Sequence, residues 1–277
     1  MPVSVPPGIL SGDVTARGLR RRGERPRTGG PMSHWTDTFF TGFWSNMQRS
    51  PAMADAAVRE ARVLRKVLRL RRGSRVADIP CGDGRISLEL ARLGCEVVGL
   101  DACEPSIRRA RGKFARAELA GEFHVGDMRA PGLQEGSFSA VINWWGSFGY
   151  FDDDTNLEVL RGFARLVRKG GRVLIDQVNR EYVLRHFIER GEHTSGGIRV
   201  VTRNRWDARR QRIGGSWTFE RRGRRTRRSS SIRVYTPSQM EALMARSGLR
   251  LERLVDGTTG EPFTRGSRRM SSIGRRP

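Results

Sequence analysis

The residues with the clearest chemical meaning are three aspartates and two glycines in the first half of the chain. Asp78, Asp101 and Asp127 each close a short apolar run. Gly82 and Gly84 follow the first of these runs, where an expected strand passes into an expected helix. Glycines leave the backbone open to close approach, and carboxylates accept hydrogen bonds and favour positive charge. Together these residues predict a site for a cationic ligand that carries hydroxyl or amino groups.

A dinucleotide is the first alternative for a strand, a glycine turn and a helix. That ligand requires the spacing G-x-G-x-x-G, which brings a pyrophosphate to the N-terminus of the helix. Here the frame from Gly82 reads GDGRIS, so the third glycine is missing and Asp83 stands where it would repel a pyrophosphate. The turn therefore favours a phosphate-free ligand with a positive centre, such as the sulfonium S-adenosylmethionine.

The elements that must position these residues alternate between short apolar strands and amphipathic helices. We expect strands at 75–80, 95–101, 122–127, 138–145 and 172–178, and helices at 85–93, 104–118 and 154–168. Such alternation is typical of an α/β fold with a mostly parallel sheet covered on both faces. It places the three aspartates at the carboxyl ends of successive strands, where open sheets bind their ligands.

The flanking regions differ in composition and periodicity. Residues 1–31 form an expected disordered basic tail, and Met32 is a candidate start of the working protein. Residues 32–70 predict an N-terminal helical cap, followed by the main domain at 71–277. Within that domain, about 190–235 reads as an antiparallel insert with strands at 198–206, 211–220 and 231–235, and a hairpin tip at Gly223. A helix after Thr236 and strands at 249–256 and 268–274 complete a sheet of seven strands.

The charge of the chain leaves two interpretations open. The sequence holds 52 lysines and arginines against 29 acids, a formal net charge of +23. This indicates either nucleic-acid binding or a general drift of composition toward arginine, and the scarcity of lysine favours the drift. Cys81, Cys95 and Cys103 lack metal-binding spacing, so we expect free thiols in a reducing cytoplasm and no metal site. No apolar run is long enough for a membrane helix.

Five segments in order resemble the class I S-adenosylmethionine-dependent methyltransferases. DIPCGDGR, VVGLDAC and VGDMRA resemble their first three motifs, and FSAVINWWGSFGYFDD and LVRKGGRVLIDQ their fourth and fifth strand regions. The resemblance spans roughly residues 70–178 and implies a doubly wound, Rossmann-like sheet with an antiparallel last strand. It also implies the cofactor contacts: Asp78, Gly82 and Gly84 on the methionine part, Asp101 on the ribose, Asp127 and Met128 on the adenine, and Asn143 beside the methyl group. Cys81 and Ala102 are expected cofactor-binding residues as well.

Each of these residues also has a purely structural interpretation. Asp101 can cap the following helix, Asp127 can fix a loop, and Asn143 can hold backbone. Cys81 is expected to be a small buried residue rather than a nucleophile.

The acceptor is expected to bind beside a dense group of aromatic residues. Trp144, Trp145 and Tyr150, with Phe148 and Phe151, can wall an apolar pocket and stabilise a cation, although core packing is the alternative. Trp35, Phe39, Phe40, Phe43 and Trp44 are candidates for a lid over the same site.

A possible general base is His186, which follows the fifth strand. Arg180 and Tyr182 stand nearby and could hold a carboxylate or phosphate of the acceptor. A lone histidine is more often structural, so this hypothesis competes with a plain surface role.

The leading prediction is a methyltransferase that uses S-adenosylmethionine and acts on a small molecule, with the insert and the N-terminal helices shaping its pocket. One alternative is an RNA methyltransferase that docks RNA on the arginine-rich strands. The other is a protein that binds the cofactor without transferring its methyl group.

Overall fold

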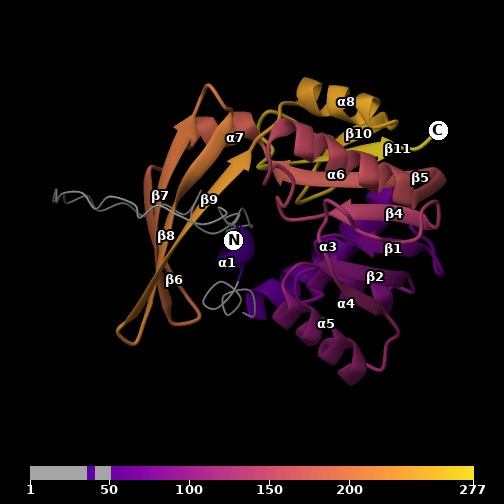
Figure 1. The fold of residues 1–277 in the computed structure, drawn as a ribbon, viewed down its shortest axis with the longest axis horizontal. Helices are drawn as coiled ribbons and strands as arrows, with labels where there is room; N and C mark the ends of the chain where they lie inside the picture. Colours follow the sequence, from indigo (N-terminus) through magenta and orange to yellow (C-terminus); the bar gives the residue numbers. More distant parts are fainter. Residues whose placement is uncertain (1–35, 41–50) are drawn as a thin grey trace.

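The structure is a computed structural model that describes residues 36–40 and 51–277 (Figure 1). The predicted basic tail at 1–31 and the lid candidates Trp35, Phe43 and Trp44 lie outside the described residues. Within the described part, the expected helical cap contributes two helices, α1 (Thr36–Phe39) and α3 (Pro51–Leu68).

A seven-stranded sheet forms the core, in the order β10-β11-β5-β4-β1-β2-β3. Its strands are β1 (Arg75–Asp78), β2 (Glu96–Asp101), β3 (Glu122–Val125), β4 (Phe138–Asn143), β5 (Val167–Val178), β10 (Arg250–Asp256) and β11 (Arg269–Arg275). The five strands from β3 to β5 pair in parallel, while β11 pairs antiparallel with both β5 and β10. The predicted doubly wound sheet with an antiparallel last strand is confirmed.

Helices cover both faces of this sheet because its central strands are apolar on both sides. The helices are α3, α4 (Arg85–Arg92), α5 (Glu104–Arg116), α6 (Asp153–Leu166) and α8 (Pro237–Arg246), whereas α7 (Arg180–Arg185) packs against the base of the insert. Val76, Ala140 and Val141 of the central strands are fully buried, as expected for parallel strands packed on two sides. The predicted capping box of α8 is present, with Thr236 and Gln239 satisfying each other's backbone N–H groups.

The insert forms a separate antiparallel sheet in the order β6-β7-β8-β9, which stands beside the core with α1 between them (Figure 1). Its strands are β6 (Arg190–Ser195), β7 (Ile198–Asp207), β8 (Arg212–Arg221) and β9 (Arg224–Arg233). The hairpin tip was predicted correctly, since Arg222 and Gly223 adopt positive φ angles of 49° and 74° between β8 and β9.

The sequence underestimated this insert sheet. The strand β6 was missed, and β9 begins at Arg224 rather than at Ser231. Both segments are polar, RGEHTS and RRTRRSSSIR, so their side chains carry little strand signal. They are strands because their backbones complete the ladders of β7 and β8.

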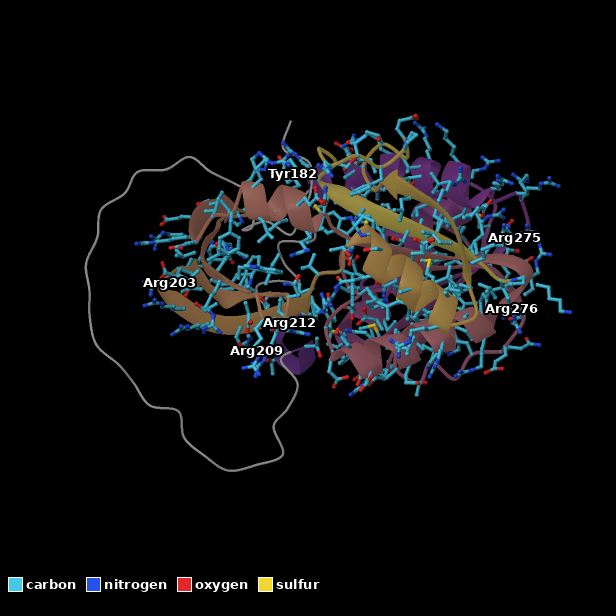
Figure 2. The ribbon with its side chains drawn as sticks, turned by 90° about the horizontal axis from the view of Figure 1, so that it is seen from above. Tyr182, Arg203, Arg209, Arg212, Arg275 and Arg276 are labelled. Atoms are coloured by element: carbon cyan, nitrogen blue, oxygen red, sulfur yellow. The ribbon has the colours of Figure 1, made fainter. Side chains whose placement is uncertain are left out.

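The two faces of the insert sheet have opposite character. Ile198, Val200 and Trp217 lie on the inner face, where they pack with Phe39 of α1. Arginines of β7, including Arg203, lie exposed on the outer face, as the alternation predicts. Figure 2 shows Arg203 and Arg209 at the insert end of the molecule, opposite Arg275 and Arg276.

Candidate functional site

A cavity of about 540 Å³ opens at the carboxyl ends of the parallel strands and continues between the two sheets. We call its part at the strand ends the acidic half. It is lined by Asp78, Cys81, Gly82, Asp101, Ala102, Asp127 and Met128, all predicted cofactor residues. We call the remainder the aromatic half, because α1, the loop 144–151 and the insert line it with aromatic and apolar side chains.

The turn between β1 and α4 depends on its two glycines. Gly82 and Gly84 adopt φ angles of +56° and +72°, a region that favours glycine. A Cβ on Gly84 would also lie 2.9 Å from the Cβ of Ala110, whereas a Cβ on Gly82 would meet no atom within 4 Å. Gly84 therefore permits close packing of α4, and Gly82 leaves the backbone open toward the cavity.

Asp101 ends β2 with its carboxylate held in place by backbone. Its Oδ2 accepts from the Gly82 N–H at 2.8 Å, and its Oδ1 accepts from the Cys103 N–H at 2.8 Å. Burial raises the pKa of Asp101, while these two hydrogen bonds oppose the rise. Each oxygen keeps a free lone pair, so the carboxylate can still accept two hydroxyl groups from a ligand.

Asp78 lies deeper, at the end of β1. Its side chain is buried, and its Oδ2 accepts from the Ser87 hydroxyl at 2.7 Å. Burial raises the pKa of Asp78 to about 7, so its proton occupancy changes near neutral pH. Burial also raises the pKa of the neighbouring Cys81 thiol, which stays protonated and is therefore no nucleophile.

Asp127 and Met128 follow β3 at the cavity wall. The Asp127 carboxylate accepts from the Arg129 backbone N–H and from its Nε, both at 2.8 Å. The Arg129 guanidinium in turn lies 4.9 Å from the ring centroid of Phe151. Asp127 therefore fixes its loop, as the structural alternative holds, and at the same time lines the cavity.

Asn143 does not itself line the cavity, but its Nδ2 lies 3.9 Å from the Sδ of Met128, which does. It is the last residue of β4 and is fully buried, and its Nδ2 donates to the Ile79 carbonyl oxygen at 2.9 Å. Its Oδ1 has no hydrogen-bond partner among the described residues. The side chain points from β4 toward the segment after β1, so it holds backbone, while Trp144 and Trp145 reach the cavity.

A buried acid on α3 organises these two tryptophans, and the sequence reasoning missed it. Glu60 accepts from the Trp144 Nε1 at 3.2 Å and from the Trp145 Nε1 at 2.9 Å. It also pairs with Arg85 at 2.9 Å, whose guanidinium lies 4.7 Å from the Trp145 ring centroid. The available signal was its place on the buried, alanine-rich face of α3, between Ala57 and Ala61.

A second buried pair supports the same loop from β5. Asp176 accepts from the Trp145 backbone N–H at 3.0 Å and from the Arg269 Nε at 3.1 Å. The Arg269 guanidinium lies 4.4 Å from the Trp144 ring centroid. These contacts hold Trp145 at a φ of +67°, a conformation that is costly for a residue with a side chain.

His186, Arg180 and Tyr182 are corrections, since none of them lines the cavity. The chain turns after β5 into α7, which packs through Val183 against the base of the insert. His186 is exposed at the end of α7, with its ring stacked on Tyr182 at 4.2 Å. Arg180 lies over the Trp206 ring instead. This helix therefore supplies no base or anion-binding group to the cavity.

The aromatic half is assembled from segments far apart in sequence. Phe40 of α1 stacks on Tyr150 with centroids 5.7 Å apart, and Phe39 meets Trp217 of β8 edge to face at 5.6 Å. Ile213 and Ile232 of the insert complete the wall. Pockets of this kind, apolar with a few polar groups, are typical of small-molecule sites.

Two further features concern the residues that the structure describes. Among them, no group of three histidine, cysteine, aspartate or glutamate side chains is placed to hold a metal ion. No helix within 36–40 or 51–277 has the length and apolarity needed to cross a bilayer.

The acidic half fits S-adenosylmethionine. Asp101 retains lone pairs for a ribose diol, and the open space at Gly82 admits bulk against the backbone. Asp78 and Asp101 favour a cation and disfavour a phosphate beside the turn. The three strand-end acids face one cavity, as the sequence predicted.

Comparisons with known proteins agree with this reading. Residues 76–171 match a family model described as a methyltransferase domain. A ubiquinone biosynthesis O-methyltransferase from Xanthomonas oryzae pv. oryzae is 29% identical over 134 residues, which cover 44% of this chain and 54% of that protein. The 23S rRNA (uracil(1939)-C(5))-methyltransferase RlmD from Neisseria lactamica is 39% identical over 79 residues, 28% of this chain and 17% of that protein. The chain thus spans about half, or less, of the length of these curated relatives.

A solved structure extends the likeness beyond the matched motifs. The S-adenosylmethionine-dependent methyltransferase from Clostridium acetobutylicum has a TM-score of 0.70 at 12% identity, over 84% of this chain and 96% of that chain. At this identity the likeness concerns the fold. The family model, in contrast, covers the glycine turn and all three strand-end aspartates. Residues 76–171 thus match a methyltransferase domain, and the fold around them is similar to that of the S-adenosylmethionine-dependent methyltransferase from Clostridium acetobutylicum.

Proposed function

We propose that this protein transfers a methyl group from S-adenosylmethionine to a small-molecule acceptor. The observation that carries the proposal is the continuity of one cavity, which joins the strand-end acids to an aromatic wall. A cofactor in the acidic half would direct its reactive end toward the aromatic half.

When bound, the cofactor supplies a methyl group on a positively charged sulfur. Asp101 would accept the ribose hydroxyls, and Asp78 would face the cationic amino acid end. The faces of Trp144 and Trp145 would stabilise positive charge beside the sulfur and exclude water. Transfer of this kind needs above all that the acceptor atom be held in line at short distance, which is the work of the aromatic wall.

The described residues of the aromatic half favour an acceptor that reacts without a strong protein base. Burial raises the pKa of Tyr150, so its hydroxyl stays protonated at neutral pH and acts as a hydrogen-bond donor. His186 lies elsewhere. An amine with a free lone pair, or an acidic hydroxyl that ionises in water, meets this condition.

A small acceptor is favoured over RNA by the direction of the arginines. Arg199, Arg203 and Arg205 lie on the outer face of the insert sheet, whereas the cavity lies against its inner face. RNA docked on the outer face would be separated from the cavity by the sheet itself. The longer match is to an enzyme of ubiquinone biosynthesis, and the match to the rRNA enzyme is limited to 79 residues.

Calorimetry and turnover together test the proposal. We expect S-adenosylhomocysteine to bind and NADH not to bind, and S-adenosylhomocysteine to accumulate when the protein is incubated with S-adenosylmethionine and pooled metabolites. A parallel titration with bulk RNA should give weak binding with a shallow salt dependence. A steep salt dependence together with methylation of RNA would overturn the choice of acceptor. Binding without turnover in any pool would favour a non-catalytic role.

A further inference from the structure

The insert is joined to the core by two short connections, residues 179–189 before β6 and 234–236 after β9. The chain connections alone would let the sheet tilt relative to the core, because both lie at the same end of the insert, so packing and polar contacts must fix its position. The aromatic half of the cavity needs the insert and the loop 144–151 at a fixed separation. A direct contact between the insert and this loop would hold them at that separation.

Arg212, the first residue of β8, makes such a contact. Its Nη1 donates to the Phe151 carbonyl oxygen at 2.7 Å, and its Nη2 contacts the carbonyl oxygens of Tyr150 and Gly149 at 3.1 and 3.2 Å. The same guanidinium donates to the Ser231 hydroxyl at 2.9 Å and to the Ser231 carbonyl oxygen at 2.8 Å. One side chain thus joins β8, β9 and three successive carbonyls of the loop.

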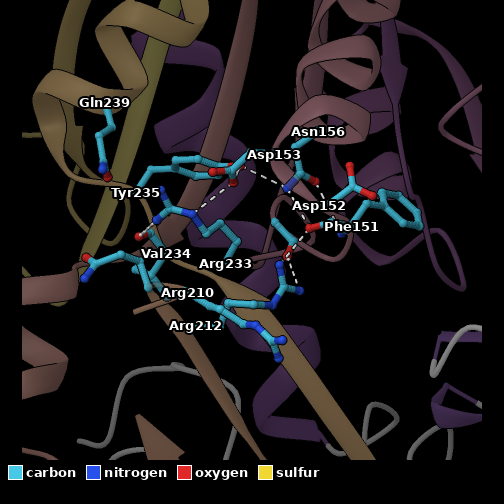
Figure 3. Close-up of polar contacts among 12 residues, drawn as sticks. Phe151, Asp152, Asp153, Asn156, Arg210, Arg212, Arg233, Val234, Tyr235 and Gln239 are labelled. Carbon is cyan, nitrogen blue, oxygen red and sulfur yellow. Dashed lines mark hydrogen bonds and ion pairs between the residues drawn. The ribbon is translucent and has the colours of Figure 1, made fainter. Parts of the chain in front are cut away.

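A second group of contacts reinforces the same junction (Figure 3). Arg233, buried at the end of β9, pairs with Asp153 at 2.9 Å, and its backbone N–H donates to the Gly149 carbonyl oxygen at 2.8 Å. The Tyr235 hydroxyl also donates to Asp153 at 2.9 Å, and Asn156 of α6 donates to that hydroxyl at 3.0 Å. A Cβ on Gly149 would clash with the Arg233 carbonyl oxygen, so only glycine lets the two backbones meet.

The position of Arg212 links this junction to the cavity. Its neighbour Ile213 lines the aromatic half from the insert, and Tyr150 and Phe151 line the same half from the loop. Building on the methyl transfer proposed above, we propose that Arg212 is a positioning residue that holds the insert against the loop and so keeps the acceptor wall closed. It touches neither the glycine turn nor the strand-end aspartates, so cofactor binding does not depend on it.

The chemistry of arginine explains why this residue type is needed. The planar guanidinium directs donors from three nitrogens in fixed directions, whereas a lysine ammonium is a single point of charge. Burial lowers the pKa of Arg212, and the nearby Tyr235, Asp153 and Asp152 partly oppose that fall. The guanidinium adds donors to loop carbonyls that lie outside any strand or helix; two of them, Gly149 and Phe151, also accept from the Arg233 N–H and the Asn156 side chain.

Three variants separate this role from a general effect on stability. R212M removes every donor, R212K keeps the charge on one nitrogen, and R203M makes the same change at an exposed arginine of the insert sheet. Hydrogen exchange is followed in peptides covering 144–151 and 230–235, with β2 as the internal reference. Affinity for S-adenosylhomocysteine is measured on the same samples by calorimetry.

We expect R212M to exchange about tenfold faster in the two junction peptides, the factor that corresponds to one or two lost hydrogen bonds. The β2 peptide and the affinity for S-adenosylhomocysteine should change less than about twofold. R212K should lie between R212M and the wild type, and R203M should match the wild type. With an acceptor from the metabolite screen, R212M should raise the KM for the acceptor about tenfold and leave the KM for S-adenosylmethionine unchanged.

Unchanged exchange in the junction peptides, or equal acceleration in β2, would overturn the positioning role. If R212M does not fold, the same comparison between R212K and R203M decides the question. Failure of the wild type to bind S-adenosylhomocysteine would instead count against the proposed methyl transfer, while the exchange data would still report on the junction.

Discussion

The acidic and aromatic halves of the cavity are built in different ways. The acidic half comes from short segments after neighbouring parallel strands, β1, β2 and β3, so a local motif specifies most of it. The aromatic half comes from α1, the loop 144–151 and the insert, which approach each other only in the folded chain. The acidic half can therefore be predicted from local sequence, whereas the aromatic half depends on how separate elements assemble.

Charge sharpens the contrast between the two regions. Residues 190–235 contain 14 arginines and only three acids, and the arginines of β7 face away from the cavity. The cavity is lined by five acids and three arginines at one end and mainly by apolar side chains at the other. The net charge of the chain therefore says little about the ligand that its cavity binds.

The largest expected effect comes from the buried pair Asp176–Arg269, which supports the loop 144–151. R269M leaves the Asp176 carboxylate buried without its partner, and we expect the free energy of unfolding to fall by roughly 3–5 kcal/mol in urea titrations. R275M, an exposed change on the same strand, is the control and should cost less than about 0.5 kcal/mol. Equal losses in the two variants would show that the buried pair does not support the fold.

The two glycines of the turn should separate stability from binding. In G84A the new Cβ is strained by the positive φ and also clashes with Ala110, so we expect the free energy of unfolding to fall by about 2–4 kcal/mol. G82A faces open space, so strain alone should cost about 1 kcal/mol, while affinity for S-adenosylhomocysteine falls at least about tenfold. Chemical denaturation and calorimetry on both variants check this. A G82A variant with normal affinity would contradict backbone approach by the ligand.

Two aspartates of the acidic half should differ in their contribution to binding. D101A removes a carboxylate that is oriented by two N–H groups, and we expect affinity for S-adenosylhomocysteine to fall by about 1.5–3 kcal/mol. D127A should cost less than about 1 kcal/mol, since that carboxylate is half exposed and already paired with Arg129. Calorimetry measures both. If D127A proves the more damaging, the assignment of the ribose to Asp101 is wrong.

The raised pKa of Asp78 predicts a pH dependence of binding. At pH 6 the buried carboxyl is mostly protonated, because its pKa is about 7, and the ammonium group of the ligand would favour its ionised form. Affinity for S-adenosylhomocysteine should therefore rise about tenfold from pH 6 to pH 8, with proton release on binding. Titrations in buffers of different ionisation heat measure that release. D78N should abolish the dependence, and a dependence that survives in D78N would assign it to another group.

The same group should affect folding with the opposite sign. The pKa of Asp78 is 3.8 in the reference state and about 7 in the folded protein, so the folded state holds the extra proton between these values. The stabilising contribution of this group should thus be lost as pH rises through that interval. D78N should flatten this part of the stability profile.

The smallest effect is expected on the outer face of the insert. R203M should change the free energy of unfolding by less than about 0.5 kcal/mol and leave cofactor affinity unaltered. A loss of turnover in this variant would mean that the outer face takes part in acceptor binding. It would contradict the proposal that the acceptor binds only on the inner side of the insert sheet. Thermal unfolding and turnover assays test it.

The sequence predicted the parallel strands and the aspartates at their carboxyl ends well, because strong apolar periodicity and a glycine turn are local signals. It placed Asp78, Asp101 and Asp127 at one site, and the structure brings them to one cavity. The prediction was wrong for His186, Arg180 and Tyr182, because it assumed that residues close to β5 in the chain would also lie close to the cavity. The short helix α7 leads those residues away toward the insert.

Local residue order was enough to specify the cofactor end of the site, since each acid follows directly from the strand that carries it. The contacts of Glu60 with two tryptophans, and of Arg212 with three carbonyls, join residues tens of positions apart. No periodic pattern in the sequence predicts such contacts. They exist because packing of α3, β8 and the loop 144–151 leaves buried polar groups that must find partners, and only the assembled chain brings those partners within reach.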